Sequence, residues 1–382
     1  MRSHFRSLLC VFLFLFSLGS FPVQAQTRSI ISNLANPAIG FNALFKAQVA
    51  PDLDQPYGIE FEEAEISLIS TVDPYWTLAA NLVFAPDGVD PEEVYATSSS
   101  IPGIGLKVGK IRGSFGKHGL LHTHAFPFIQ APVIMANTIG EEGFKDAGIE
   151  AAWLTPLPWF CELTLGGYHA VGPDTDHPLD FGSSNHDNIP YLGHLKNLFD
   201  VDDNTTLELG GSFLGGYGAD GLHHSAYGAD LTLRNVPLRQ SNQQGWILQS
   251  ELLARDSWNN DGSFASHDAI GWYASLQYRW SQVWWTGIRV EEAFNSFSDV
   301  MVSKDPATGL PNLDSNGNAI PVAGHVQCLS ANIAWAASEF SMIRLEYSGA
   351  RETPDDESGT VWDNRIMAQM NFTIGFHPPH AY

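Results

Sequence analysis

The sequence predicts an all-β protein, a single transmembrane antiparallel β-barrel of about sixteen strands without a plug domain. Three observations support this prediction. Apolar and polar residues alternate along much of the chain, as they do in strands whose two faces meet different surroundings. The alternating segments run for about ten residues, longer than most strands of globular sheets. Aromatic residues collect at their ends, as they do at membrane interfaces: Tyr75, Trp76, Trp159, Phe160, Trp272, Trp280, Trp284, Trp285 and Tyr347.

The chain opens with a predicted signal peptide, residues 1–25. Arg2 and Arg6 precede an apolar run over residues 8–18, and Ala25 occupies the usual position before a cleavage site. The run is too short to cross a membrane as a helix, and no later segment is long enough either. We therefore expect export, with residues 26–382 forming the barrel in the outer membrane of a Gram-negative bacterium.

The strands can be followed in order through their alternation. Short and long connections alternate along the chain only if 191–199 is a strand and another strand precedes Ile59. In a soluble sandwich the apolar faces would pack a core, but the strand length, the aromatic ends and the charges in mid-strand favour a barrel in lipid. The predicted strands lie around residues 40–50, 64–68, 76–84, 163–165, 191–199, 205–216, 231–233, 270–280, 288–290, 333–335, 343–347 and 366–376.

Composition excludes several classes of protein. The formal net charge of −23 leaves no basic footprint for a nucleic acid. After removal of the signal peptide, only Cys161 and Cys328 remain, too few for a disulfide scaffold, although one bridge between strands stays open. Serines and histidines share loops, but no spacing singles out a catalytic nucleophile, so we expect no enzyme.

Charged residues on the polar face of the strands are the predicted lining of the lumen. A wall of mixed charge would pass small hydrophilic solutes and tune ion selectivity. The alternative interpretation is that these charges pair with one another and hold neighbouring strands together. The predicted pore-lining residues are Glu63, Glu65, Lys107, Glu162, Glu208, Asp230, Arg234, Glu251, Arg255, Arg279, Arg289, Glu291, Arg344 and Glu346.

Other acidic residues fall in segments that we expect outside the membrane. An acidic mouth would favour cations by focusing negative potential; solubility and divalent-ion bridges to lipopolysaccharide are the competing explanations. These residues are Asp87, Asp90, Glu92, Glu93, Glu141, Glu142, Asp355, Asp356 and Glu357.

Three histidines form the one local cluster with metal-like spacing. His118, His122 and His124 lie in the connection 113–146, which we expect outside the barrel or folded inward as a constriction. Imidazole suits zinc, copper and nickel ions, so a zinc site is one hypothesis and no cofactor is otherwise expected. The alternative is that these are ordinary loop histidines that pack on Phe126 and Phe128.

Eight short motifs follow one another in the middle of the chain: Glu63-Ala64-Glu65-Ile66, Val72-Asp73-Pro74-Tyr75, Gly109-Lys110-Ile111-Arg112, Phe115-Gly116, His122-Thr123-His124, Gly140-Glu141-Glu142-Gly143, Gly148-Ile149 and Trp153-Leu154-Thr155-Pro156. Their order resembles the phosphate-selective porin (O/P porin) superfamily, in particular a branch of outer-membrane proteins often labelled zinc-regulated receptors. The resemblance implies a sixteen-stranded barrel, usually trimeric, that allows passive diffusion. It does not extend to the basic pore lining of phosphate-selective members.

These observations predict a porin-like channel for passive diffusion of small hydrophilic solutes or ions, with a weak preference for cations. Two alternatives remain: a metal-responsive uptake or binding barrel that uses the histidine loop, and a closed structural or adhesive barrel. Expected partners are membrane lipid, lipopolysaccharide, the barrel-assembly machinery and two further copies of the chain. The last strand is the expected assembly signal, with Phe376 as its terminal aromatic, because Pro378 and Pro379 cannot continue a ladder.

Overall fold

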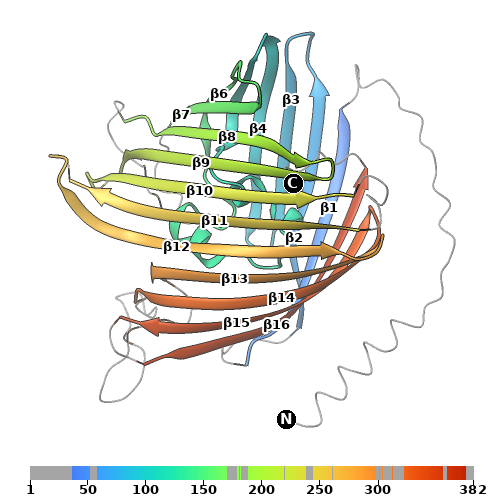
Figure 1. Cartoon of the computed structure of the whole chain (residues 1–382), viewed down its shortest axis with the longest axis vertical. Coiled ribbons are helices and arrows are strands. Elements are labelled where there is room, and N and C mark those ends of the chain that lie inside the picture. Colours follow the sequence, from blue (N-terminus) through green and yellow to red (C-terminus); the bar gives the residue numbers. More distant parts are fainter. Residues whose placement is uncertain are drawn as a thin grey trace.

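A computed structural model describes residues 37–51, 58–169, 179, 181, 188–218, 220–237, 244–259, 261–297, 301, 303, 312, 322–355 and 359–375. Sixteen strands form one closed antiparallel barrel, so the predicted fold class is confirmed (Figure 1). The strands are β1 (Ala38–Val49), β2 (Gly58–Thr71), β3 (Thr77–Ala85), β4 (Gly88–Ile101), β5 (Ile104–Arg112), β6 (Lys145–Leu154), β7 (Phe160–Tyr168), β8 (Tyr191–Asp202), β9 (Thr205–Tyr217), β10 (His223–Asn235), β11 (Gly245–Trp258), β12 (Phe264–Arg279), β13 (Trp284–Ser296), β14 (Gly324–Ser338), β15 (Ser341–Pro354) and β16 (Val361–Gly375).

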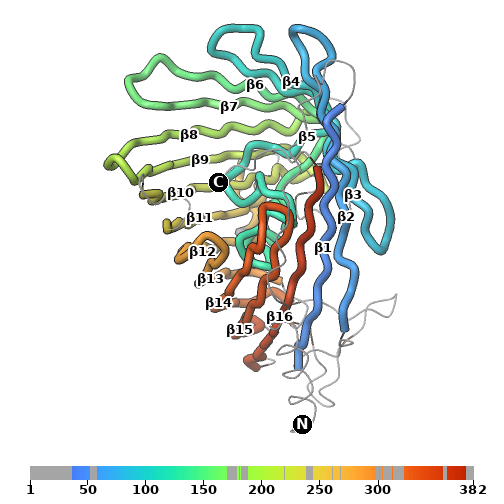
Figure 2. The backbone as a smooth tube through the Cα atoms, turned by 90° about the vertical axis from the view of Figure 1, so that its right-hand side faces the viewer, coloured from blue at the N-terminus to red at the C-terminus, as the bar shows by residue number. Residues whose placement is uncertain are grey.

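The first and last strands close the barrel. β1 pairs with β16 from Gly40 opposite Gly375 to Val49 opposite Ile366, and it pairs with β2 on its other side (Figure 2). Closure satisfies every sheet edge, which a strand in lipid requires because no water is available to its backbone. The alternation of short and long connections predicted a strand before Ile59 and another over 191–199, and both are present.

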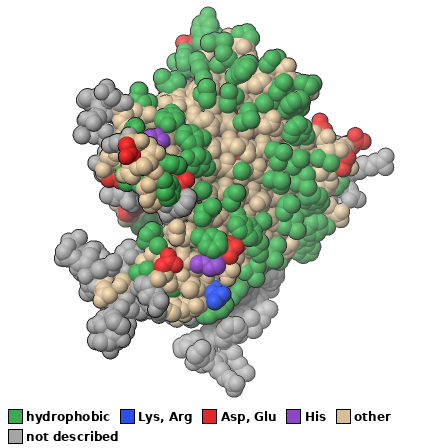
Figure 3. Space-filling view, turned by 60° about the vertical axis from the view of Figure 1, so that its left-hand side comes forward, with side chains coloured by type: hydrophobic (Ala, Val, Ile, Leu, Met, Phe, Trp, Pro, Cys, Tyr) green, Lys and Arg blue, Asp and Glu red, His purple; other side chains and the backbone are tan. Residues whose placement is uncertain are grey.

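The two faces of each strand meet different surroundings, as predicted. On β16, Ile366, Phe372 and Ile374 are 47%, 43% and 66% exposed on the outside, while Met367 and Gln369 are buried inside. Hydrophobic side chains are spread over much of the outer face in Figure 3, among polar side chains and backbone, and the few visible charged side chains lie toward its margins. This apolar exterior is the surface that a lipid bilayer covers.

The connection between β5 and β6, residues 113–144, folds into the barrel, and we call it the inner segment. Figures 1 and 2 both show it inside the ring of strands. It contains two short 3-10 turns, η1 (His118–Leu120) and η2 (Thr123–Ala125), and one short helix, α2 (Val133–Thr138). The predicted constriction within 113–146 is therefore present.

A hydrophobic cluster fixes the inner segment against one side of the barrel. Phe115, Ile134, Met135 and Ile139 of the segment are at most 1% exposed. They pack against side chains that point inward from the wall, and this packing fills the lumen on that side. The wall residues of the cluster are Ile111, Tyr168, Leu192, Leu214, Ala226, Leu253, Ala269, Tyr273 and Ala293.

Three further predictions concern the cysteines, the two ends of the chain and membrane-spanning helices. Cys161 and Cys328 are both free, so the bridge left open between them is absent. The signal peptide 1–25 and the residues from Phe376 to the end lie outside the described residues. No helix among the described residues has the length and apolar character needed to cross a membrane.

Candidate functional site

Wall carboxylates from the predicted pore lining hold the backbone of the inner segment. Glu251, Glu291 and Glu346 are each at most 5% exposed and accept hydrogen bonds from backbone N–H groups. Such charge-assisted bonds are stronger than neutral ones. They join Lys117 N to Glu251 Oε2 (3.1 Å), His118 N to Glu251 Oε1 (2.7 Å), Ile129 N to Glu346 Oε2 (2.8 Å) and Val133 N to Glu291 Oε2 (2.7 Å).

Polar side chains of the wall bind the carbonyls of the same segment. Arg289 donates to Gln130 O at 2.7 Å, and two wall asparagines also donate: Asn332 to Pro127 O at 3.0 Å and Asn371 to His124 O at 2.9 Å. The inner segment has little secondary structure of its own. Its buried backbone N–H and C=O groups are instead hydrogen-bonded to side chains of β11 and β13 to β16. Part of the predicted pore lining is therefore a set of anchors.

The remaining predicted pore residues are distributed around the wall. Glu208 pairs with Lys117 of the inner segment at 2.8 Å and Lys107 with Glu93 at 3.3 Å, whereas Arg234 is exposed at one end of the barrel. Arg279 donates to the carbonyls of Ser281 and Gln282 in the turn after β12. The others are buried or half-buried on the inward faces of their strands: Glu63, Glu65, Glu162, Asp230, Arg255 and Arg344.

Two polar cavities flank the inner segment. One, of about 550 Å³, is lined by short-turn residues such as Asp73 and Tyr75 and by Lys107, Glu150 and Glu162. The other, of about 390 Å³, lies toward the opposite end of the strands. Six carboxylates and three basic side chains line it: Glu62, Glu141, Glu142, Glu291, Glu352, Asp363, Lys46, Arg289 and Arg365.

The prediction that Glu92 and Glu93 lie in an external segment is wrong. Asp90, Glu92 and Glu93 belong to β4, and Glu92 and Glu93 are each 3% exposed. In the ladder with β3, Glu93 pairs with Asn81 and Pro91 pairs with Leu82, so Glu92 is the extra residue of a β-bulge. A bulge breaks the alternation of faces, and both carboxylates consequently enter the barrel.

Glu142 also differs from the prediction of an acidic external mouth. It belongs to the inner segment, where its carboxylate binds Lys145 at 2.6 Å and Thr123 at 3.0 Å. Glu141 lines the smaller cavity, Asp87 lies in the turn between β3 and β4, and Asp355 lies in a turn after β15. Asp356 and Glu357 fall outside the described residues.

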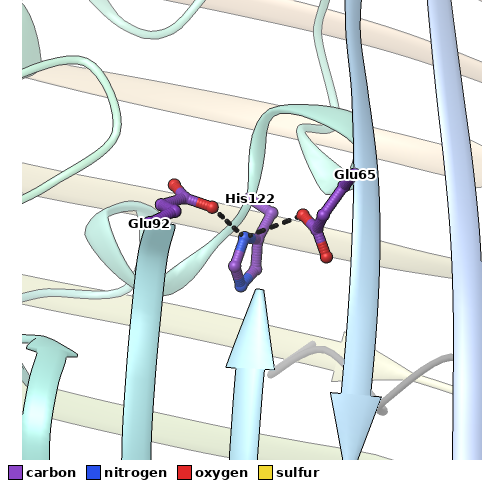
Figure 4. A group of neighbouring side chains, drawn as sticks. All are labelled: Glu65, Glu92 and His122. Carbon is purple, nitrogen blue, oxygen red and sulfur yellow. Dashed lines mark hydrogen bonds and ion pairs between the residues drawn. The ribbon is translucent and has the colours of Figure 1, made fainter. Parts of the chain in front are cut away.

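Glu65, Glu92, Glu93, His122 and His124 form what we call the Glu/His cluster. His122 Nδ1 lies 2.9 Å from Glu92 Oε2 and 3.3 Å from Glu65 Oε2 (Figure 4), and its Nε2 lies 3.1 Å from Glu93 Oε2. The ring of His124 stacks on that of His122, with 5.6 Å between centroids, and His124 Nδ1 is 3.5 Å from Glu65 Oε2. One imidazole thus joins carboxylates from β2 and β4 to the inner segment.

The second oxygen of each carboxylate is fixed by its surroundings. Glu92 Oε1 pairs with Arg112 and with Lys145, the latter at 3.1 Å. Glu93 Oε1 accepts the backbone N–H of Arg112 at 3.0 Å, and Glu65 Oε1 accepts the Ser67 hydroxyl at 2.6 Å. Arg112 is only 2% exposed and also donates to Leu121 O at 2.8 Å. These contacts aim the other oxygens at His122.

The structure brings His122 and His124 together and places His118 apart from them. The ring of His118 lies against Phe126, with 4.4 Å between centroids, and approaches Tyr273 edge-on. Burial lowers the pKa of His118 from 6.5 to about 3, helped by Arg289 and Arg112. Burial and Arg112 also lower the pKa of His122, but hydrogen bonds with Glu65, Glu92 and Glu93 outweigh them and hold it well above 6.5.

Comparison with known proteins bears on the fold. No model of a protein family matches the sequence. An uncharacterised protein of Aquifex aeolicus (strain VF5) is 28% identical over 361 residues, which cover 87% of this chain and 71% of that protein.

Solved structures of an outer-membrane channel, a porin and another outer-membrane protein share the architecture. The outer membrane channel DcaP of Acinetobacter baumannii has a TM-score of 0.57 at 10% identity and covers 94% of this chain and 100% of its own. The anion-selective porin from Comamonas acidovorans has a TM-score of 0.57 at 9% identity (88% and 99% covered), and the trimer form of OmpT from Vibrio cholerae has 0.52 at 8% (88% and 99%). The chain therefore has the fold of Gram-negative outer-membrane porins, and with its closed barrel and apolar exterior it is an outer-membrane β-barrel protein.

Proposed function

We propose that the protein is an outer-membrane channel for passive diffusion of small hydrophilic solutes or ions, with a weak preference for cations. The observation that carries the proposal is the pair of polar cavities on either side of the inner segment. The segment is packed against the wall from β5 to β13; one cavity is lined by β2 to β7 and the other by β1, β2 and β13 to β16. Solutes would therefore pass beside the inner segment.

The charge of the cavities supports the preference for cations. Six carboxylates face three basic side chains in the smaller cavity, and three carboxylates face one lysine in the larger. In a narrow space with protein walls, such an excess raises the local concentration of cations. The absence of a basic ladder along the described inward faces also argues against phosphate selectivity.

The buried hydrophobic cluster favours a second candidate, the closed structural barrel. Its residues fill part of the cross-section with side chains that are at most 5% exposed. If the inner segment never leaves room for solutes, the barrel would serve as a surface or scaffold. The two candidates differ in one property, the passage of ions.

We also propose that the protein belongs to the O/P porin superfamily and forms a homotrimer. The resemblance to the O/P porin superfamily includes Glu65, His122 and His124 of the Glu/His cluster and Arg112, which contacts His122. A homotrimer is supported by that resemblance and by the trimer form of a barrel of the same fold. Lipopolysaccharide and the barrel-assembly machinery are proposed partners on the strength of the fold.

Conductance in planar lipid bilayers tests the channel. Refolded protein should give discrete steps of current, and substitution of Trp284 by Phe on the lipid-facing side should leave their size unchanged. Dense insertion of correctly folded protein without current would overturn the channel and leave the closed barrel. Passage of radiolabelled sugars into liposomes then separates solutes from ions.

A further inference from the structure

We propose that Glu65, Glu92 and His122 bind one divalent transition-metal ion, which fastens the inner segment to the barrel wall at β2 and β4. The ligand atoms are Oε2 of Glu65, Oε2 of Glu92 and Nδ1 of His122, and all three lie within 4.8 Å of one another. Three protein ligands leave a coordination position open, as in metal sites that also hold water. This ligand set differs from the three histidines suggested by sequence spacing.

The spacing of these atoms fits a bound ion. Bonds of about 2.0–2.2 Å in a tetrahedral arrangement place neighbouring ligand atoms roughly 3.3 Å apart. His122 Nδ1 is already 2.9 Å from Glu92 Oε2 and 3.3 Å from Glu65 Oε2. The third separation, between the two carboxylate oxygens, is at most 4.8 Å, so a shift of the glutamate side chains toward each other would complete the site.

The hydrogen bonds around the ligands are of the kind that orient metal sites. A histidine that binds a metal through one nitrogen usually donates its other N–H to a carboxylate. His122 Nε2 faces Glu93 Oε2 at 3.1 Å in this role. The far oxygens of Glu92 and Glu65 are held by Lys145 and Ser67, which points the near oxygens at the same place.

Glu65 supplies an independent sign that a positive ligand is required. Its Oε2 is buried, the residue is 3% exposed, and the atom makes no hydrogen bond of good geometry; its neighbours are His122 Nδ1 at 3.3 Å and His124 Nδ1 at 3.5 Å. Nδ1 of His122 carries one hydrogen at most, yet two carboxylate oxygens converge on it. A metal ion at this point satisfies both oxygens, whereas burial of a carboxylate oxygen without a partner is costly.

The donor set indicates the class of metal. One imidazole and two carboxylates suit zinc and similar transition ions better than magnesium or calcium, which prefer all-oxygen surroundings. Because the ligands come from β2, β4 and the inner segment, the ion would act as a crosslink between wall and constriction.

Metal uptake by refolded, chelator-stripped full-length protein tests the site. Titration with Zn²⁺ should show one tight equivalent per wild-type chain that His122→Ala and Glu92→Gln lack. Glu93→Gln should keep the equivalent but bind it about 10–100-fold more weakly, because Glu93 only orients the ligand. His224→Ala is the matched control, since His224 pairs with Asp220 outside the cluster, and it should bind as the wild type does.

A spectroscopic measurement on the wild type keeps the proposal testable if a variant fails to fold. X-ray absorption at the zinc edge should show a shell of nitrogen and oxygen ligands with the scattering of a single imidazole. The proposal fails if wild-type protein takes up no Zn²⁺ beyond the level of the His122→Ala variant, or if the shell contains no imidazole. Uptake that persists in both His122→Ala and Glu92→Gln would likewise overturn it.

Discussion

At the scale of single residues, burial and charged neighbours give the histidines of the inner segment different roles. His118 lies beside Phe126, and burial, with the charges of Arg289 and Arg112, lowers its pKa. His122, four positions later, meets three carboxylates. In the sequence both belong to one metal-like spacing. Spacing alone does not tell which part of the barrel wall each side chain will face, so it could not separate their roles. The alternative that loop histidines pack on Phe126 fits His118.

The low pKa of His118 predicts that it weakens the fold in acid. In the unfolded chain this group takes up a proton near pH 6.5, but in the folded protein only near pH 3. The unfolded state therefore binds more protons in this window, so the free energy of unfolding falls as the pH drops from 6.5 toward 3 and is unaffected above 6.5. Urea unfolding of wild type and His118→Gln at several pH values should show a smaller decline in the variant. Parallel declines would contradict the prediction.

At the scale of elements, the strands could be predicted and the bulges could not. The alternation of apolar and polar residues located β9, β12 and β16 because each keeps one face in lipid, and the order of short and long connections located β1 and β8. In β4 the extra residue Glu92 turns two successive carboxylates inward, and in β2 the register shift opposite Leu44 and Phe45 does the same near Glu62 and Glu63. A bulge depends on pairing with the neighbouring strand, so the local pattern of one strand gives no sign of it. The candidate site was missed for that reason.

The anchoring of the inner segment predicts the effect of removing Glu251. This carboxylate accepts the backbone N–H groups of Lys117 and His118, and bonds to charged acceptors are worth about 1.5–3 kcal/mol each. Glu251→Ala should therefore loosen the start of the inner segment and expose Lys117, which is 5% exposed in the folded protein. Limited digestion with trypsin, followed by mass spectrometry, should show faster cleavage after Lys117.

The control for this experiment is Glu339→Ala, in the exposed turn between β14 and β15. It should be cleaved after Lys117 no faster than the wild type. Equal rates in the Glu251→Ala variant and the wild type would show that the hydrophobic cluster alone holds the segment.

At the scale of the whole molecule, the wall and the lumen follow different rules. The wall is periodic, since closure, strand number and the apolar exterior all result from alternation and connection lengths. The lumen is not periodic. Its contents depend on long-range contacts such as those of Glu346 with Ile129 and of Asn371 with His124, which join residues more than 200 positions apart. Alternation therefore predicts which charged residues face inward, but not which of them, such as Glu291, bond to the inner segment and which line the cavities only.

The excess of carboxylates in the smaller cavity leads to a prediction about ion selectivity. Wild-type channels in a gradient of potassium chloride at low ionic strength, where charges are least screened, should give a reversal potential that indicates preference for potassium. The double variant Glu352→Gln, Asp363→Asn removes two of the six carboxylates and should bring the permeability ratio closer to one. Glu292→Gln is the matched control, because Glu292 follows Glu291 on β13 and bonds His325 and Gln327 on the outer face. Preference for chloride in the wild type, or an equal change in the control, would refute the assignment of selectivity to this cavity.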